Sequence, residues 1–370
     1  MLSLLLVSLL ALFYKLRVKL KYQILLLLSV CALALAGLYV LKKDSADGRL
    51  LIWRCTYEMV KDKPQGFGEG GFKANYMNYQ AKYFEKHPDS KYAMLADNVN
   101  RPFNEYLLVL VDYGIFGLLL LTVFAFSYWH SYHVNKQKTV IQHLAGWCLC
   151  GIAVFALFSY PLHYPLVWVM GIASCITIRY RKNPNQSISK FAYWFKLATL
   201  LPIVLALSWL LSRSMYAEMK WCRIAHKSLQ GQTEQMLPEY GVLYPKLQNN
   251  EAFLYNYAAE LNVVQQYEKS LEIARECERL WADYDLQMLM ADNYQNMQQN
   301  QEAESHYIKA SQMCPVKFMP LYRLFQLYEN CGEDKKTQVM AGKILKKPVK
   351  VMSPTIKNIQ QEIQKKINDL

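Results

Sequence analysis

Long apolar runs without charge constrain this chain more than any other feature of its sequence. Residues 23–41 (QILLLLSVCALALAGLYVL) contain no charged side chain, and further apolar runs cover residues 106–129, 142–160, 164–178 and 191–211. A helix needs about 20 apolar residues to cross the hydrocarbon core of a bilayer. We therefore predict a transmembrane domain over residues 1–211 with about six spans. Residues 1–14 supply only part of the first span, so we expect the chain to begin inside a larger membrane domain.

Basic residues in the short loops predict the orientation of these spans. They cluster before the second span, after the third and between the last two: Lys15, Arg17, Lys19, Lys21, Lys136, Lys138, Arg179, Arg181, Lys182 and Lys190. All three clusters lie on one side if the spans alternate, and the positive-inside rule makes that side cytoplasmic. Loop 42–105 and residues 212–370 then face outward. The net charge of +13 reflects topology and lipid contact rather than nucleic-acid binding.

The cysteines give no sign of a metal centre or a disulfide framework. The nine cysteines form no C-x-x-C pair. Four of them lie within the apolar runs, where a free cysteine behaves as a small hydrophobic residue: Cys31, Cys148, Cys150 and Cys175. We therefore predict no bound metal and no cofactor.

From residue 212 onward the sequence is polar and repeats with a period of about 34 residues. The clearest unit places small, aromatic and proline residues where a tetratricopeptide repeat has them: Ala291, Tyr294, Ala303, Tyr307, Ala310 and Pro315. The small residues let paired helices approach closely, and the proline ends the second helix. The predicted fold class is all-α, a polytopic transmembrane helical domain followed by a tetratricopeptide-like helical solenoid at residues 212–370. Such a solenoid binds a protein partner.

The outward loop 42–105 is the part of the chain where we expect chemistry. It carries Trp53, a glycine cluster at residues 66–71 (GFGEGG) and a dense run of aromatic side chains. A solvated connector needs none of these, and the loop is too aromatic for disorder. Loops of this length are usually functional.

Two signatures in and beyond this loop resemble the O-antigen ligase family. The first comprises residues 47–53 (DGRLLIW), 59–64 (MVKDKP) and 66–72 (GFGEGGF). The second comprises residues 100–107 (NRPFNEYL) and 112–117 (DYGIFG). The resemblance covers about residues 23–211, and members of one branch of the family carry a tetratricopeptide tail, as this chain does.

The resemblance implies glycan transfer at the periplasmic face of a bacterial inner membrane. Members of the family take a saccharide from an undecaprenyl-diphosphate carrier and pass it to lipid A core, a protein or a growing glycan. They are inverting glycosyltransferases that use no metal. The resemblance makes Arg49 the first candidate for contact with the diphosphate, since a guanidinium pairs with phosphate oxygens bidentately and stays charged. Five further substrate-binding candidates are Trp53, Arg54, Gly66, Gly68 and Asn104.

These candidates also have structural interpretations. Arg54 lies four residues before Glu58 and can form an ion pair with it on one helix face. Tryptophan is common where helices pack at a membrane interface, and this is the structural interpretation of Trp53. The glycines permit turns that other residues do not, and their N–H groups can also cradle phosphate.

The second signature departs from the family at its histidine. The family places a histidine at the position of Phe103 or of Arg101, where it would serve as general base. Three alternatives remain: Arg101 acts as a second phosphate-binding cation with Glu105 or Asp112 as base, His87 moves in, or no base is needed. The candidate catalytic residues are therefore Arg101, Glu105 and His87. His163 lies in a short outward turn between two predicted spans.

A second class of function stays open beside glycan transfer. In it the chain is a catalytically inactive membrane-anchored adaptor, and residues 212–370 capture a protein partner.

Overall fold

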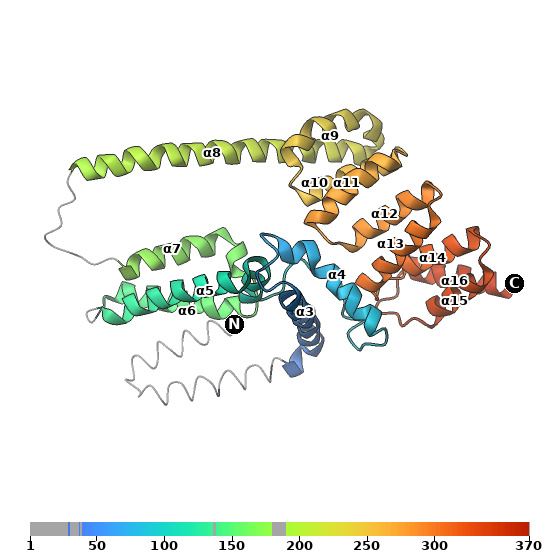
Figure 1. The fold of residues 1–370 in the computed structure, drawn as a ribbon, viewed down its shortest axis with the longest axis horizontal. Helices are drawn as coiled ribbons and strands as arrows, with labels where there is room; N and C mark the ends of the chain where they lie inside the picture. Colours follow the sequence, from blue (N-terminus) through green and yellow to red (C-terminus); the bar gives the residue numbers. More distant parts are fainter. Residues whose placement is uncertain (1–28, 30–36, 38, 136–137, 180–189, 370) are drawn as a thin grey trace. The chain divides into compact units, whose positions relative to one another are not determined.

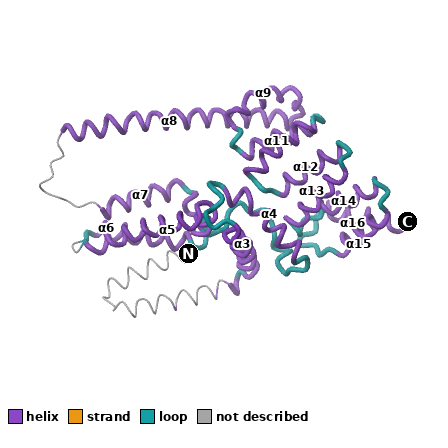
Figure 2. The backbone as a smooth tube through the Cα atoms, viewed as in Figure 1, coloured by secondary structure: helices purple, strands orange, loops and turns teal. Residues whose placement is uncertain are grey.

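The computed structural model describes residues 29, 37, 39–135, 138–179 and 190–369. Every regular element in these residues is a helix, and none of them forms a strand (Figure 2). The predicted all-α fold class is confirmed. The chain divides into two compact units, Met1–Arg181 and Lys182–Leu370. The predicted domain boundary at residue 211 falls inside a continuous helix, α8 (Lys190–Lys227), which contains the predicted span 191–211.

Three apolar helices pack together in the first unit (Figure 1). They are α5 (Glu105–Val134), α6 (Val140–Ala156) and α7 (Pro165–Arg179), and α7 packs on both of the others. Among the described residues α5 has the length and composition to cross a membrane, whereas α6 and α7 are shorter. The 3₁₀ turn η1 (Pro161–His163) joins α6 to α7. The predicted spans 1–14 and most of 23–41 lie outside the described residues.

The outward loop folds into two helices, α3 (Lys43–Asp62) and α4 (Gly71–Lys86), which pack against each other. α3 contributes the buried residues Leu51, Ile52, Cys55 and Met59, and α4 contributes Phe72, Tyr76, Met77, Ala81 and Phe84. The aromatic residues of the loop thus form a small core. This packing explains why loop 42–105 carries so many apolar side chains.

The link between α3 and α4 crosses α5 at a pair of glycines. A Cβ atom on Gly66 would lie 2.5 Å from the amide nitrogen of Gly114, and a Cβ on Gly114 would lie 2.3 Å from the carbonyl carbon of Gln65. Both glycines have positive φ, 91° and 66°, and Gly114 interrupts the helical backbone of α5. Three backbone hydrogen bonds close the crossing: Phe67 N to Val111 O, Gly68 N to Asp112 O, and Ile115 N to Pro64 O.

The second unit is a succession of helical hairpins (Figure 1). After α8 come η2 (Ser228–Gln232), α9 (Thr233–Leu247), α10 (Glu251–Val263), α11 (Tyr267–Leu280), α12 (Tyr284–Asn296), α13 (Asn300–Met313), α14 (Met319–Asn330), α15 (Asp334–Lys346) and α16 (Pro354–Asp369). From α9 on, each helix packs on the next. The small and aromatic positions predicted within the clearest repeat are buried from Ala291 to Ala310.

Three of the hairpins share one turn geometry. Gln265, Gln298 and Gly332 have φ of 62°, 61° and 69°, and each stands between the two helices of its hairpin. The residue after each donates its N–H to a carbonyl five residues earlier: Gln266 to Leu261, Gln299 to Tyr294, and Glu333 to Tyr328, all at 2.9 Å. This recurrence is a structural repeat, and its assignment as a tetratricopeptide solenoid stays a prediction.

Candidate active site

Helix α3 fixes two predicted site residues against the segments that precede α5 and follow α6. The Nη1 of Arg49 donates to the carbonyl oxygen of Phe158 at 3.0 Å, and its guanidinium carbon lies 5.5 Å from the centre of the Phe103 ring. One turn further on, the indole N–H of Trp53 donates to the carbonyl oxygen of Pro102 at 2.9 Å. Arg49 is half-buried, so it is held in place while part of its guanidinium stays accessible. Trp53 fastens α3 to the segment that carries Arg101.

Arg101 lies beside a histidine from a distant part of the chain. Its Nη2 is 2.8 Å from the Nδ1 of His163, and its guanidinium carbon lies 5.5 Å from the centre of the Tyr160 ring. The rings of Tyr160 and Phe103 are 5.7 Å apart. A row of side chains therefore runs from Arg49 through the paired rings of Phe103 and Tyr160 to Arg101 and His163. We call these five residues the cation–aromatic cluster.

Glu105 and Asn104 hold the backbone around this cluster. The Oε1 of Glu105 accepts the N–H of Leu162 at 3.0 Å, which ties the start of α5 to turn η1. Glu105 is only 6% exposed, so its carboxylate faces the turn rather than open solvent. Asn104 caps α5, because its Oδ1 accepts the N–H of Leu107 at 3.0 Å. Both residues therefore shape the site, whatever else they do.

The glycine-rich turn lies against a carboxylate of the same chain, the side chain of Asp112. Asp112 is 8% exposed, and its Oδ1 accepts the N–H of Phe72 at 2.9 Å. A carboxylate at the first turn of a helix complements the helix dipole and the free N–H groups there. Asp112 thus caps α4, which leaves it poorly placed to act as a base.

Gly66 and Gly68 use their amides in the crossing of α5. The N–H of Gly66 donates to Lys63 at 3.0 Å, and the N–H of Gly68 donates to Asp112 at 2.8 Å. Their backbone donors are therefore occupied by the chain's own carbonyls. The geometry favours a role in shaping the loop over direct contact with phosphate.

Arg54 and His87 lie apart from the cation–aromatic cluster, at the contact between α3 and α4. Arg54 is 3.5 Å from the hydroxyl of Tyr83, and its guanidinium carbon lies 5.8 Å from that ring. The His87 ring stacks on Tyr83 with centroids 4.8 Å apart. The ion pair considered between Arg54 and Glu58 is not formed; Glu58 instead lies 3.9 Å from Lys61.

Sequence reasoning did not assign Tyr160 or His163 to the site. Both belong to the turn between α6 and α7, about 60 residues after Arg101. One signal was present, because the predicted topology places this turn on the same outward side as loop 42–105. Nothing in the local sequence specifies which residues of the turn approach the loop.

Part of this arrangement lies in a segment that matches a known protein family. The family model described as O-antigen ligase matches residues 1–122. Residues 1–122 carry an O-antigen ligase domain. This family consists of bacterial membrane proteins that transfer glycans. The domain includes Arg49, Arg101 and Glu105, while the partners contributed by η1 lie beyond the matched residues.

Comparison with the curated proteins and with the solved structures gives no match. Within the part of the chain that the structure describes, no group of three or more His, Cys, Asp or Glu side chains could hold a metal ion.

Proposed function

We propose that this chain is a glycan ligase or polymerase. It transfers a saccharide from an undecaprenyl-diphosphate carrier to lipid A core, a protein or a growing glycan. The observation that carries the proposal is that Arg49 and Arg101, 52 residues apart in the O-antigen ligase domain, flank one pair of rings, Phe103 and Tyr160. Fixed cations beside an apolar surface suit a substrate that joins a charged diphosphate to a lipid and a sugar.

The chemistry of the leaving group explains the need for arginine. Negative charge grows on the diphosphate as its bond to the sugar breaks, so a guanidinium in contact with it stabilises the transition state more than the ground state. Arg49 is held by Phe158 through one N–H, and its remaining donors are available for two phosphate oxygens. Arg101 lies on the other side of the rings, against Tyr160 and His163.

The location of the cluster fits a lipid-linked donor. Glu105 is the first residue of α5, the helix with the length and composition of a membrane span, and Arg101 lies four residues before it. A polyprenyl carrier keeps its chain in the bilayer and presents its diphosphate at the surface. We propose a multi-pass protein of the bacterial inner membrane, with the cluster and residues 212–370 in the periplasm.

A genetic experiment tests this function without knowledge of the sugar. Gene disruption should cause undecaprenyl-linked glycan to accumulate in lipid extracts, and the wild-type gene should remove it. Arg49→Ala should leave the accumulation in place although the protein inserts normally. Lys43→Ala, on the same helix, exposed and outside both signatures, is the control and should restore transfer. Normal transfer by Arg49→Ala would rule out the proposed role of the cluster.

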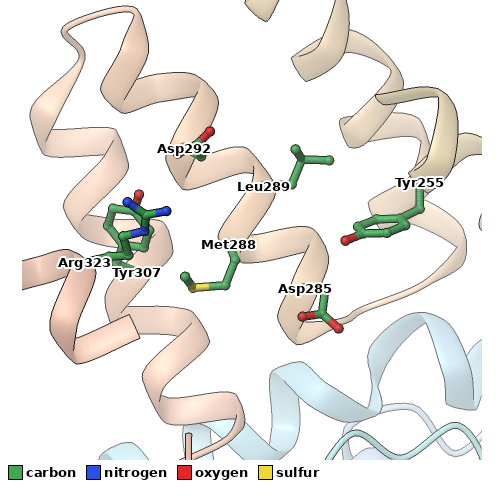
Figure 3. Close-up of a pocket in the computed structure, with 7 residues that line it drawn as sticks. All are labelled: Tyr255, Asp285, Met288, Leu289, Asp292, Tyr307 and Arg323. Atoms are coloured by element: carbon green, nitrogen blue, oxygen red, sulfur yellow. The ribbon is translucent and has the colours of Figure 1, made fainter. Parts of the chain in front are cut away.

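A second candidate function, partner capture, is favoured by a pocket along α12. Its volume is about 250 Å³. Figure 3 shows side chains of four helices around it: Tyr255 of α10, Asp285, Met288, Leu289 and Asp292 of α12, Tyr307 of α13, and Arg323 of α14. The four α12 residues have the spacing of one helix face. A groove lined by successive hairpins is a surface on which an extended segment can lie.

The pocket is lined by charged side chains of both signs, the carboxylate of Asp292 and the guanidinium of Arg323. Asp292 accepts hydrogen bonds from the side-chain amides of Asn262 and Asn296 at 3.1 and 3.3 Å. Arg323 donates to the amide oxygen of Gln326 at 3.3 Å. Neutral amides orient both groups without cancelling their charges. A ligand with charged groups of its own can therefore pair with them.

The α10 end of the pocket has negative potential. Burial first, and then the carboxylates of Asp285 and Asp283, raise the pKa of the Tyr255 hydroxyl to about 12. We propose that this end takes a lysine or arginine side chain of a partner peptide, while Arg323 takes a carbonyl or carboxylate. Under this second function, the C-terminal unit captures a protein partner and takes no part in glycan transfer.

Site-specific crosslinking separates the two functions. A photoreactive residue at Met288 should crosslink a periplasmic protein, and Asp285→Lys should abolish the crosslink by repelling the cationic side chain. Asp334→Lys, an equally exposed aspartate on α15, should keep it. Under the adaptor hypothesis alone, Arg49→Ala is silent and Asp285→Lys reproduces the effect of deleting residues 212–370.

A further inference from the structure

His163 is the histidine that reaches the cation–aromatic cluster. Of the seven histidines in the chain, it is the one within hydrogen-bond distance of Arg101, at 2.8 Å. Its ring also lies 6.2 Å from that of Tyr160. The side chain is exposed, so a substrate hydroxyl can approach it. His87, the histidine considered from the sequence, instead stacks on Tyr83.

The contact with Arg101 determines which ring nitrogen of His163 carries a proton. A guanidinium has only donors, so the 2.8 Å contact requires Nδ1 to be an unprotonated acceptor. The neutral imidazole then carries its proton on Nε2. Arg101 therefore orients a histidine whose Nδ1 is unprotonated and accepts the Arg101 N–H, and an unprotonated ring nitrogen is what a general base needs.

The backbone of turn η1 is held on both sides of this histidine. The N–H of Leu162 donates to Glu105 at 3.0 Å, and the carbonyl oxygen of Leu162 accepts the indole N–H of Trp168 at 2.6 Å. Side chains that act in catalysis need such support, because small displacements reduce the rate strongly. An exposed turn with no further role would not require a buried carboxylate as its anchor.

The two ends of the cation–aromatic cluster suit the leaving diphosphate and the attacking hydroxyl of an inverting glycosyl transfer. Arg49 lies against Phe103, and His163 lies beyond Tyr160 at the other end of the ring pair. In an inverting transfer the attacking hydroxyl and the leaving group stand on opposite faces of the sugar. A sugar over the two rings would place its diphosphate toward Arg49 and its other face toward His163.

From this geometry we propose that His163 accepts the proton of the acceptor hydroxyl, a role that rests on the proposed glycan transfer. The hydroxyl replaces the Arg101 N–H at Nδ1. As the bond between the acceptor oxygen and the anomeric carbon forms, the O–H proton moves to Nδ1. The bond from the anomeric carbon to the diphosphate oxygen breaks, and its electron pair leaves with the diphosphate beside Arg49. The imidazolium then releases its proton to water.

The test uses the full chain in detergent with lipid-linked glycan extracted from cells in which the gene is disrupted. Release of undecaprenyl diphosphate measures transfer, and added undecaprenyl diphosphate measures binding at the cluster. His163→Gln should lower the transfer rate about 100-fold or more, the size expected for loss of a general base, without weakening binding. His163→Ala should regain activity when imidazole is added, which a purely structural defect would not do. His226→Gln on α8, exposed and 3.2 Å from Gln230, is the matched control and should be normal.

The possible outcomes separate the two proposals. If Arg49→Ala is inactive while His163→Gln keeps at least a third of the wild-type rate, the base is wrong and the glycan transfer stands. Loss of transfer in His87→Gln, with His163→Gln active, would assign the base to α4 instead. If the wild-type chain releases no undecaprenyl diphosphate, the proposed function fails and the role of His163 fails with it.

Discussion

Gly66 and Gly114 lie back to back, so close that a Cβ atom on Gly66 would come within 2.5 Å of the amide nitrogen of Gly114. Their contact is the point at which the α3–α4 link crosses the bend in α5. Because the opposing atoms belong to the backbone, they cannot move aside as a flexible side chain would.

Substitution of either glycine should disrupt the O-antigen ligase domain. Gly114→Ala combines a clash with the Gln65 carbonyl carbon at 2.3 Å with a positive φ that alone costs about 1–2 kcal/mol. We expect a large loss of folded protein, measured by thermal unfolding in detergent. Gly48→Ala is the control, since Gly48 lies in α3 with open space around it and should be stabilised by up to about 1 kcal/mol.

Asp112→Asn distinguishes a helix cap from a catalytic base. The amide oxygen of asparagine can still accept the N–H of Phe72, so we expect a loss of about 1 kcal/mol in stability and retained glycan transfer. Asp112→Ala should cost more, because it leaves buried N–H groups without an acceptor. A stable Asp112→Asn protein without activity would contradict the assignment as a cap.

Glu105→Gln tests whether the buried carboxylate positions turn η1 or takes the proton itself. The glutamine side chain can still accept the N–H of Leu162, so we expect most of the transfer activity to remain. Glu105→Ala removes the acceptor and should lower activity by displacing the turn. Inactivity of both variants, with normal insertion, would make Glu105 the base and overturn the role proposed for His163.

Substitutions at two of the left-handed hairpin turns should have opposite effects on stability. Gly332→Ala should cost about 1 kcal/mol, because alanine is strained at a φ of 69°. Gln298→Gly, at the equivalent turn, should gain up to about 1 kcal/mol by relieving the strain at a φ of 61°. Hydrogen exchange of the flanking helices measures both changes. Equal effects of the two substitutions would show that the turns are not equivalent.

The raised pKa of Asp283 predicts that the stability of the α12–α13 hairpin depends on pH. Burial raises the pKa of this α12 cap to about 6, from an ordinary value of 3.8. The folded state therefore binds the proton more tightly than the unfolded state. The resulting stability is present below about pH 4 and is lost as the pH rises through about 6.

Asp283→Asn removes this titration while it keeps the cap. Its side-chain oxygen can still accept the N–H groups of Asp285 and Leu286. We expect the variant to be more stable than the wild type at pH 7.5 and about equal at pH 4. Exchange rates of the α12 amides, corrected for intrinsic rates, provide the measurement. A wild-type array that becomes more stable from pH 4 to 7.5 would contradict the assignment.

The sequence predicted the features that depend on local composition. Apolar runs specified α5 and α8, and the small and aromatic positions near Ala291 and Tyr294 specified one hairpin. The arginine of the first signature, Arg49, does lie in the cation–aromatic cluster. In each case the pattern lies within one helix or one hairpin, where spacing along the chain determines which residues meet.

Features that depend on contacts between distant segments could not be predicted. Gly66 was assigned to a turn from its conformational freedom, but nothing in the sequence pairs it with Gly114. His163 approaches Arg101 because the turn between α6 and α7 packs beside the start of α5, and the register of that packing is set by contacts between distant segments. The left-handed turns at Gln265 and Gln298 were missed for another reason, since glutamine does not mark positive φ.

The shared turn geometry of the hairpins has a consequence for how the second unit comes apart. Each hairpin is closed by its own hydrogen bond, from Gln266, Gln299 or Glu333, and packs mainly on its neighbours. Cooperativity in such an array extends only as far as the contacts between adjacent hairpins. We therefore expect the second unit to open from its ends inward, with the terminal helices exchanging their amide hydrogens before the central hairpins.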